Sequence, residues 1–377
     1  MSEQMQAAPS LEEAGAAIES KNQFPCGQCG AKLDFKPGSA VLQCPYCSHE
    51  NPIPQSEEDI VEVDFAAVLA QLREQQPVEE HATVHCDGCG ANVDKPDNVS
   101  SMTCPFCDSN IVMTPQSAKL IKPMSLLPFA VTREQAKQKF SDWINSLWFA
   151  PNKLKQYARV DSKFNGMYVP HWTFDSNTVS VYRGQRGEHY TTTETYTTTE
   201  NGKTVTKTRQ VTKTRWYPAS GTVFCGFDDV LTPASNSLPR KYVEELEPWD
   251  LPQLVPYADE YLSGFSSETY TIELEDGFVA ARQKMDSHIR YRVKRDIGGD
   301  EQRISSIHTQ YNDVTFKHIL LPMWISAYRF SETVYRFLVN ARTGEVQGER
   351  PWSWVKITLA VLGAAAVLIG LLVMVNG

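Results

Sequence analysis

The sequence predicts an α+β protein with two N-terminal zinc ribbons, a largely antiparallel β-rich domain carrying a protruding hairpin, and one C-terminal transmembrane helix. Three observations lead to this prediction. One four-cysteine spacing occurs twice near the amino terminus, strand-like runs outnumber helical ones within residues 118–350, and residues 357–375 contain no charge. With 377 residues, the chain is also long enough to bury a sizeable core beside its small modules.

Residues 1–21 are an acidic leader that we expect to be disordered. They contain no basic run followed by an apolar stretch, so the sequence indicates neither a secretory signal nor a transit peptide. The chain is therefore expected to stay in a reducing compartment, where disulfides are rare.

Residues 22–53 and 84–113 are expected to be zinc ribbons because each carries the spacing C-x2-C-x14-C-x2-C, repeated at an offset of 60 residues. Two C-x2-C turns on a short hairpin can bring four thiolates to one tetrahedral ion. Four thiolates leave no open position for a substrate, so Zn2+ would be structural at both sites, contributing about 10–16 kcal/mol to folding in isolated modules of this kind. The expected ligands are Cys26, Cys29, Cys44 and Cys47 in the first site and Cys86, Cys89, Cys104 and Cys107 in the second.

Two other interpretations of the cysteines remain open, four disulfides and iron–sulfur clusters. Disulfides would need an oxidising compartment, which the leader does not indicate, so zinc is preferred to both. Glycine after the second cysteine (Gly30, Gly90) predicts a left-handed backbone, and proline after the third (Pro45, Pro105) predicts that the two turns of a copy differ in kind. Three nearby histidines are expected to be bystanders: His49, His81 and His85.

Residues 54–83 are predicted to be an acidic linker around one short helix. Asp64 can cap this helix and Pro77 ends the segment. Its apolar stripe is expected to pack on a ribbon or on the main domain rather than on a partner; the stripe comprises Phe65, Val68, Leu69 and Leu72.

The charge of the cysteine-rich part argues against nucleic acid as its partner. Residues 1–113 hold 5 Lys and Arg against 18 Asp and Glu. Zinc modules that grip phosphates present basic side chains, and four thiolates around one divalent ion add about two further negative charges per site. A basic protein partner is therefore the better electrostatic match.

Residues 118–350 are predicted to form an α+β domain that lies in the cytoplasm. Thr132 to Gln135 is a capping box that opens a helix, and further helices are expected near residues 242–246 and within 256–264. A final hairpin turns through residues 342–344. Many strands on few helices indicate mostly antiparallel pairing; the strand-like runs are residues 168–174, 179–182, 216–224, 270–274, 303–311, 319–330 and 334–340.

Residues 188–215 predict a polar hairpin that protrudes into water, with a two-residue turn at Asn201-Gly202. In this register Glu194 faces Arg209 and Tyr190 faces Lys213, while the other face pairs threonines. Such pairs contribute about 0.2–1 kcal/mol each, so a ribbon without an apolar face can form.

No catalytic constellation is indicated, so we predict a non-enzymatic role. Gly202-Lys203-Thr204 looks like the end of a phosphate-binding loop, but Thr197 stands where that loop needs its first glycine. Cys225 lies in an apolar run and is expected to be a buried structural thiol. Four residues could form acid–base pairs in the folded protein, but no sequence spacing assigns them to a catalytic site: His171, Asp175, His308 and Asp313.

Residues 357–375 predict a transmembrane helix, since at about 1.5 Å per residue they nearly span the hydrocarbon core of a bilayer. Trp352 and Trp354 precede them where an interfacial aromatic belt would lie. Basic residues on the same side (Arg350, Lys356) predict that the large domain stays in the cytoplasm. The chain is thus expected to be single-pass and tail-anchored in the lipid bilayer.

Several stretches together resemble a bacterial family of membrane-anchored zinc-ribbon proteins. They are the paired motifs CGQCG…CPYC and CDGCG…CPFC, then GMYVPHWTFD, LLPMWISAYRF and FLVNARTGEVQGERPWSW. Members are often labelled as resembling the transcription-factor-IIB zinc ribbon or primosomal protein N-prime, a replication-restart helicase. This chain lacks the ATP-binding loop and the motor domains of that helicase.

The resemblance implies an adaptor of the inner (cytoplasmic) membrane, linked in some relatives to phage-shock-protein-A or flotillin-like envelope-stress systems. Our prediction is a membrane-anchored zinc-binding adaptor or scaffold that presents protein-interaction surfaces to the cytosol. The alternative is a nucleic-acid-associated zinc-ribbon protein, linked to replication or transcription, without a motor domain.

Overall fold

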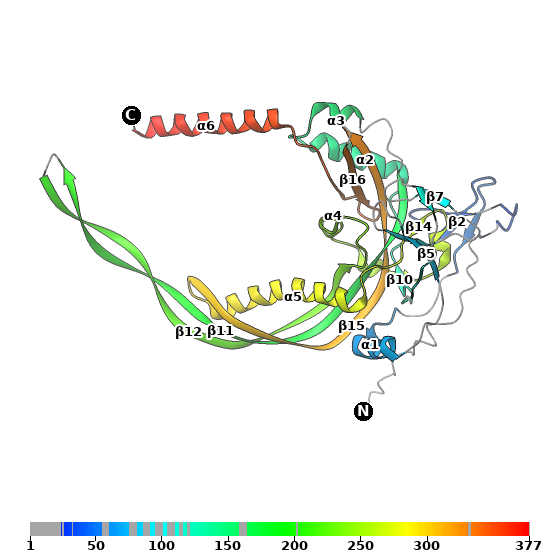
Figure 1. The fold of residues 1–377 in the computed structure, drawn as a ribbon, viewed down its shortest axis with the longest axis horizontal. Helices are drawn as coiled ribbons and strands as arrows, with labels where there is room; N and C mark the ends of the chain where they lie inside the picture. Colours follow the sequence, from blue (N-terminus) through cyan, green and yellow to red (C-terminus); the bar gives the residue numbers. More distant parts are fainter. Residues whose placement is uncertain are drawn as a thin grey trace.

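The fold is α+β, with one large, mostly antiparallel sheet, helices against its faces, and an apolar C-terminal helix that projects from the body (Figure 1). The computed structural model describes residues 24, 26–31, 33–54, 60–74, 81–85, 91–94, 101–103, 110–112, 116–118, 121–157, 164–200, 203–330 and 333–376.

The large sheet has nine strands, built on three very long ones that lie side by side. Its main path is β12 (Lys203–Pro233), β11 (Asn165–Glu200), β15 (Glu301–Phe330), β10 (Ser125–Leu126) and β13 (Val255–Pro256). Off this path lie β4 (Val63–Asp64), β14 (Ser266–Ser267), β16 (Thr333–Asn340) and β17 (Val346–Gly348). Neighbours are antiparallel except β10 with β15 and β14 with β11, so the predicted pairing mode is confirmed.

Several predicted short strands are parts of continuous long ones. Residues 168–174 and 179–182 both belong to the 36-residue β11, and residues 303–311 and 319–330 both belong to the 30-residue β15. The polar residues between these runs form bulges instead of turns: the register shifts around Asp175, and Asp229 and Asp313 adopt positive φ angles of 51° and 50°. Aspartate tolerates this conformation better than most residues, so the strands bend here without ending.

Helix α5 (Leu274–Ile297) is the largest difference from the sequence-based expectation. Residues 270–274 were expected to be a strand, and no helix was expected after them; both expectations are wrong. The helix has 24 residues and packs one face against β11, β12 and β15. Its buried side recurs every three or four residues: Leu274, Gly277, Ala281, Met285, Ile289, Val293 and Ile297.

The other helices largely follow the sequence signals. Helix α2 (Arg133–Ser146) begins with the predicted capping box, and α4 (Arg240–Glu245) covers the helix expected near residues 242–246. Residues 259–262 form only a short 3-10 turn. Before α1 (Phe65–Glu74), Asp64 Oδ1 accepts a hydrogen bond from the Ala67 amide at 2.7 Å. The apolar stripe of this helix packs on the main domain, which was one of the two packing sites expected for it.

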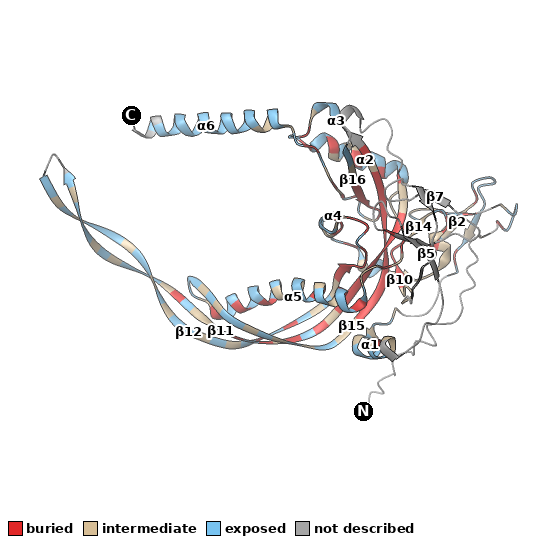
Figure 2. Ribbon diagram, in the orientation of Figure 1, coloured by how far each residue is buried: buried red, intermediate tan, exposed pale blue. Residues whose placement is uncertain are grey.

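The hairpin of β11 and β12 has the predicted register over residues 188–200 and 203–215, which we call the ribbon. Glu194 pairs with Arg209 and Tyr190 with Lys213, while the turn at residues 201–202 lies outside the described part. Each strand repeats a hexad: EHYTTT then ETYTTT in β11, and VTKTRQ then VTKTRW in β12. All charged residues except His189 thereby fall on one face, opposite a face of threonines. The ribbon extends beyond β15 and is largely exposed (Figure 2).

The core lies on both sides of the central part of β11 and β15. One side packs α2, α3 (Asn152–Tyr157) and the first cysteine module; the other packs α4 and the residues after it. At the carboxyl end, α6 (Trp354–Asn376) is long and apolar enough to cross a membrane: within it Trp354–Leu372 has a mean hydropathy of 2.4 and is not buried against the rest of the structure.

Candidate metal centre

The first cysteine module is a three-stranded sheet with two cysteine turns. Its strands are β1 (Asp34–Phe35), β2 (Val41–Gln43) and β3 (Glu50–Pro52). In the first turn the Gly30 amide donates to the Cys26 carbonyl at 2.9 Å, and in the second the Ser48 amide donates to the Cys44 carbonyl at 3.0 Å. Gly30 has the expected positive φ of 72° and Ser48 has 60°. The expectation that the two turns differ in kind is therefore wrong, because Pro45 leaves the same backbone bonds in place.

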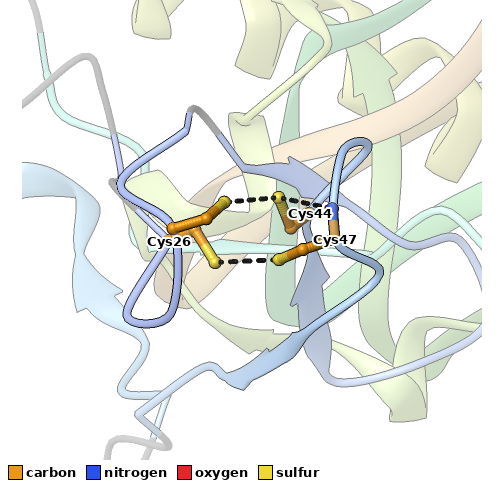
Figure 3. Close-up of side chains that lie close together, drawn as sticks. Cys26, Cys44 and Cys47 are labelled. Carbon is orange, nitrogen blue, oxygen red and sulfur yellow. Dashed lines mark hydrogen bonds between the residues drawn. The ribbon is translucent and has the colours of Figure 1, made fainter.

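The four sulfurs of this module come together in one cluster (Figure 3). Cys26 Sγ lies 3.6 Å from Cys47 Sγ, and Cys29 Sγ lies 3.5 Å from Cys44 Sγ. All four ligand atoms are within 4.8 Å of one another. A tetrahedron with Zn–S bonds of about 2.3 Å has edges of about 3.8 Å, whereas a disulfide needs about 2.05 Å. The donor set therefore fits one tetrahedral metal ion and is too widely spaced for disulfides.

Backbone amides prepare these thiols for a cation. The Gln28 amide donates to Cys26 Sγ at 3.4 Å and the Cys47 amide donates to Cys44 Sγ at 3.5 Å. Burial opposes ionisation of Cys26, but the amides of Cys29 and Gln28 lower its pKa to about 6. The amide of His49 favours the Cys47 thiolate, yet burial and the other three sulfurs raise its pKa to about 12. A cation at the centre would relieve that repulsion.

The module packs tightly on the main domain. The Phe35 amide donates to the Ser263 carbonyl at 3.0 Å, and Ser263 Oγ donates to the Leu33 carbonyl at 2.6 Å. The ring of Phe35 lies 5.3 Å from that of Tyr261 and 6.3 Å from that of Phe265. Cys26 and Cys44 are buried, whereas Cys29 and Cys47 face solvent. The cluster therefore occupies a fixed place beside the sheet, with one side accessible.

The second cysteine motif lies outside the described residues: this holds for Cys86, Cys89, Cys104 and Cys107. Parts of the backbone around it are described, and two strand pairings there match the first module at the same offset of 60 residues, although the counterparts of β1 and β2, which pair in the first module, lie in separate sheets. Val41↔Pro52 in β2 and β3 corresponds to Ser101↔Val112 in β7 (Ser101–Thr103) and β8 (Asn110–Val112). The hydrogen bond from the Leu33 amide to the Phe24 carbonyl corresponds to the pair Val84↔Val93, which joins β5 (His81–His85) to β6 (Asn92–Asp94). This agreement supports an internal duplication.

A second polar cluster, which sequence reasoning missed, holds the linker to the sheet. Ligand atoms of Glu62, Asp175 and Asp228 lie within 4.8 Å of one another. Lys317, only 7% exposed, already brings a cation: its Nζ is 3.2 Å from Glu62 and 2.8 Å from Asp229. We therefore interpret the cluster as an ion-pair latch. A lysine among apolar residues in the run TFKHILL was the only signal of it in the sequence.

The acid–base candidates are not assembled into one site. His171 is buried, its Nδ1 lies 3.0 Å from the Val169 carbonyl, and burial lowers its pKa to about 4. His308 pairs with Val181, well along the sheet from Asp175, which pairs with Thr315. Cys225 is buried in β12, as expected for a structural thiol.

Three cations of the ribbon already have partners. Lys213 Nζ lies 2.8 Å from Glu194, and Arg209 lies 3.5 Å from the same carboxylate. The guanidinium of Arg215 lies 4.9 Å from the centre of the Tyr190 ring. A phosphate backbone would have to displace these contacts, so the ribbon resembles a solvated arm more than a nucleic-acid groove.

Comparison with known proteins finds a relative in Bacillus subtilis. The uncharacterized protein YdjG of Bacillus subtilis (strain 168) is 24% identical to the chain over 254 residues, which cover 65% of this chain and 68% of YdjG. No family model matches the chain, and no solved structure matches it. The similarity to YdjG places no activity, ligand or partner on this chain.

Proposed function

We propose that this protein is a non-enzymatic, membrane-anchored adaptor whose cysteine modules are two structural zinc ribbons. The observation that carries the proposal is α6, which is apolar along its length and contacts the body only at its first turn. Exposing so much apolar surface to water is unfavourable, and a bilayer removes that cost.

The direction of α6 sets a condition on this anchoring. In Figure 1 the helix and the ribbon leave the body toward the same side. A bilayer crossed squarely by α6 in that direction would also meet the ribbon, whose charged face cannot enter hydrocarbon. We therefore expect α6 to pivot about its first turn when it inserts, after the coil that contains Pro351.

The choice of zinc rests on the donor set. Four thiolates whose sulfurs all lie within 4.8 Å of one another suit one tetrahedral ion, and Zn2+ is the ion that four cysteines hold in structural sites of this kind. Cys26, Cys29, Cys44 and Cys47 would hold the ion of the first module. The reason to propose an equivalent site in the second is that the same cysteine spacing recurs at an offset of 60 residues. The ion would supply folding free energy and no open coordination position.

An adaptor role also suits the surfaces of the chain. The acidic cysteine-rich part, whose first module is fixed beside the sheet, and the long polar ribbon offer two separate docking areas for cytosolic proteins, in keeping with partners of the phage-shock-protein-A or flotillin-like kind implied by the resemblance. The alternative, a nucleic-acid-associated role, is disfavoured because the cysteine-rich part is acidic and three of the ribbon's cations already have partners.

Metal analysis and fractionation test the proposal together. The full chain, purified from bacterial membranes in mild detergent, should contain two zinc ions and no iron. Cys44→Ser should lose one ion, because it removes a buried ligand, whereas the matched control Cys225→Ser should keep both. A chain ending at residue 350 should appear in the soluble fraction.

Each part of the proposal can fail separately. Iron in the protein, or equal zinc in Cys44→Ser and the parent, would sink the zinc assignment. Unchanged membrane association of the shortened chain would sink the anchor. Co-purifying material that disappears on nuclease treatment would favour the nucleic-acid alternative over the adaptor.

A further inference from the structure

The base of α6 is surrounded by exposed aromatic side chains from two distant parts of the chain. Trp352 and Trp354 precede or begin the helix and are 52% and 78% exposed. The turn between α2 and α3 adds Trp148, 77% exposed, and Phe149, 36% exposed. Most large aromatic side chains described in the domain are buried or half-buried, so four exposed ones at a single place need an explanation.

Hydrogen bonds tie the α2–α3 turn to the start of α6. Lys356 Nζ donates to the carbonyls of Trp148 and Ala150 at 3.1 and 2.8 Å and to Asn152 Oδ1 at 2.8 Å. The Ser353 amide donates to the Phe149 carbonyl at 2.8 Å. The turn therefore lies beside the point where α6 leaves the body.

We propose that the α2–α3 turn is a second membrane-contacting element, which seats the cytoplasmic domain in the headgroup layer beside α6. The inference rests on the proposed insertion of α6. Tryptophan rings favour the bilayer interface, where the apolar body meets lipid and the indole N–H stays hydrated. Trp148 and Phe149 would enter this layer next to Trp352 and Trp354, forming one aromatic belt from two segments.

Basic groups flank the same place and favour an anionic lipid surface. Lys153 follows the turn and is exposed, and the guanidinium of Arg350 lies 4.6 Å from the centre of the Trp352 ring. Cations close to a bilayer are attracted to anionic headgroups. Continuity with the apolar surface of α6 is the reason to assign a bilayer, instead of a protein, to these rings.

Photocrosslinking in the full chain tests this assignment. Benzoylphenylalanine replaces Trp148, Leu362 or Phe224 in separate proteins, each reconstituted into vesicles of phosphatidylethanolamine and phosphatidylglycerol. Leu362 lies within α6, and Phe224 is 69% exposed on β12, far from the helix base. We expect lipid adducts at positions 148 and 362 and none at 224.

The outcomes separate this inference from the anchor itself. Adducts at 362 without adducts at 148, or adducts at 148 to protein only, would overturn the membrane seat and leave the anchor intact. No lipid adduct at 362 would overturn the anchor. As a second measurement, Trp148→Phe should remove part of the fluorescence quenched by brominated lipids, whereas Trp249→Phe, at a buried position, should not; equal quenching in both variants would contradict the seat.

Discussion

Replacing Phe35 with alanine should release the first cysteine module from the main domain without unfolding either part. The Phe35 ring is 3% exposed and contacts the rings of Tyr261 and Phe265 across the junction. Truncating a buried phenylalanine costs about 3–5 kcal/mol. The remaining contacts would be a few hydrogen bonds, among them the Gly38 amide to the Phe129 carbonyl and Ser263 Oγ to the Leu33 carbonyl, and the smaller apolar side chains of the module that share this core.

The loss should be visible as faster amide exchange. Since each 1.4 kcal/mol changes an equilibrium constant about tenfold, Phe35→Ala should speed exchange of residues 33–38 by about two to three orders of magnitude. Tyr46→Ala is the matched control, because Tyr46 is an aromatic of the same module that is 82% exposed. The metal ligands lie on turns that Phe35 does not form, so bound metal should be retained.

Two results would refute this reasoning. Exchange that stays slow in Phe35→Ala would mean that the ring does not hold the module in place. Loss of metal together with docking would mean that the sulfur cluster needs the sheet in order to form, and that the module is not an independent metal-binding unit.

Two further predictions concern the main domain. Burial and the neighbouring Glu62 carboxylate raise the pKa of Asp175 to about 7; the folded state therefore holds a proton that the unfolded chain releases, and this stabilisation is lost as pH rises through 7. Protection factors of the amides of residues 60–74, which have the base-catalysed intrinsic exchange rate divided out, should therefore fall between about pH 4 and pH 7 and stay constant above pH 7. Asp175→Asn should abolish this fall, and its persistence in that variant would be contrary evidence. A Cβ at Gly277 would lie 2.5 Å from Trp172 Cδ1. Gly277→Ala should therefore lower the free energy of unfolding by about 1–3 kcal/mol and reduce the melting temperature. Gly363→Ala, at a position with open space around it, should leave the melting temperature unchanged. Equal melting temperatures of the two variants would show that α5 can shift.

Features set by neighbouring residues could be predicted from the sequence. The capping box at Thr132, the cap at Asp64 and the register of Glu194 with Arg209 each depend on groups a few residues apart or on one symmetric hairpin. The apolar helix α6 could also be predicted, because its length and composition are read directly from one continuous segment. The four clustered cysteines of the first module followed from spacing, because a C-x2-C turn fixes where its sulfurs point.

Features that depend on distant partners were missed. Helix α5 carries many charged residues, so its narrow apolar stripe was not recognised in the sequence. That stripe is buried only because the long strands pack against it. The strands predicted at residues 168–174 and 303–311 stopped short of Asp175 and Asp313, because sequence cannot tell a bulge from a turn when the partner strand lies more than a hundred residues away. Likewise, Trp148 lies beside Lys356 only because the fold brings them together.

The tandem hexads of the ribbon make its reach adjustable. Six residues are an even number, so removing one hexad from each strand keeps every side chain on its original face and restores the same kind of cross-strand neighbours. At about 3.3 Å per residue, each such unit sets about 20 Å of length. The length of the ribbon can therefore change in steps of one hexad from each strand while the register of the rest of the sheet stays the same.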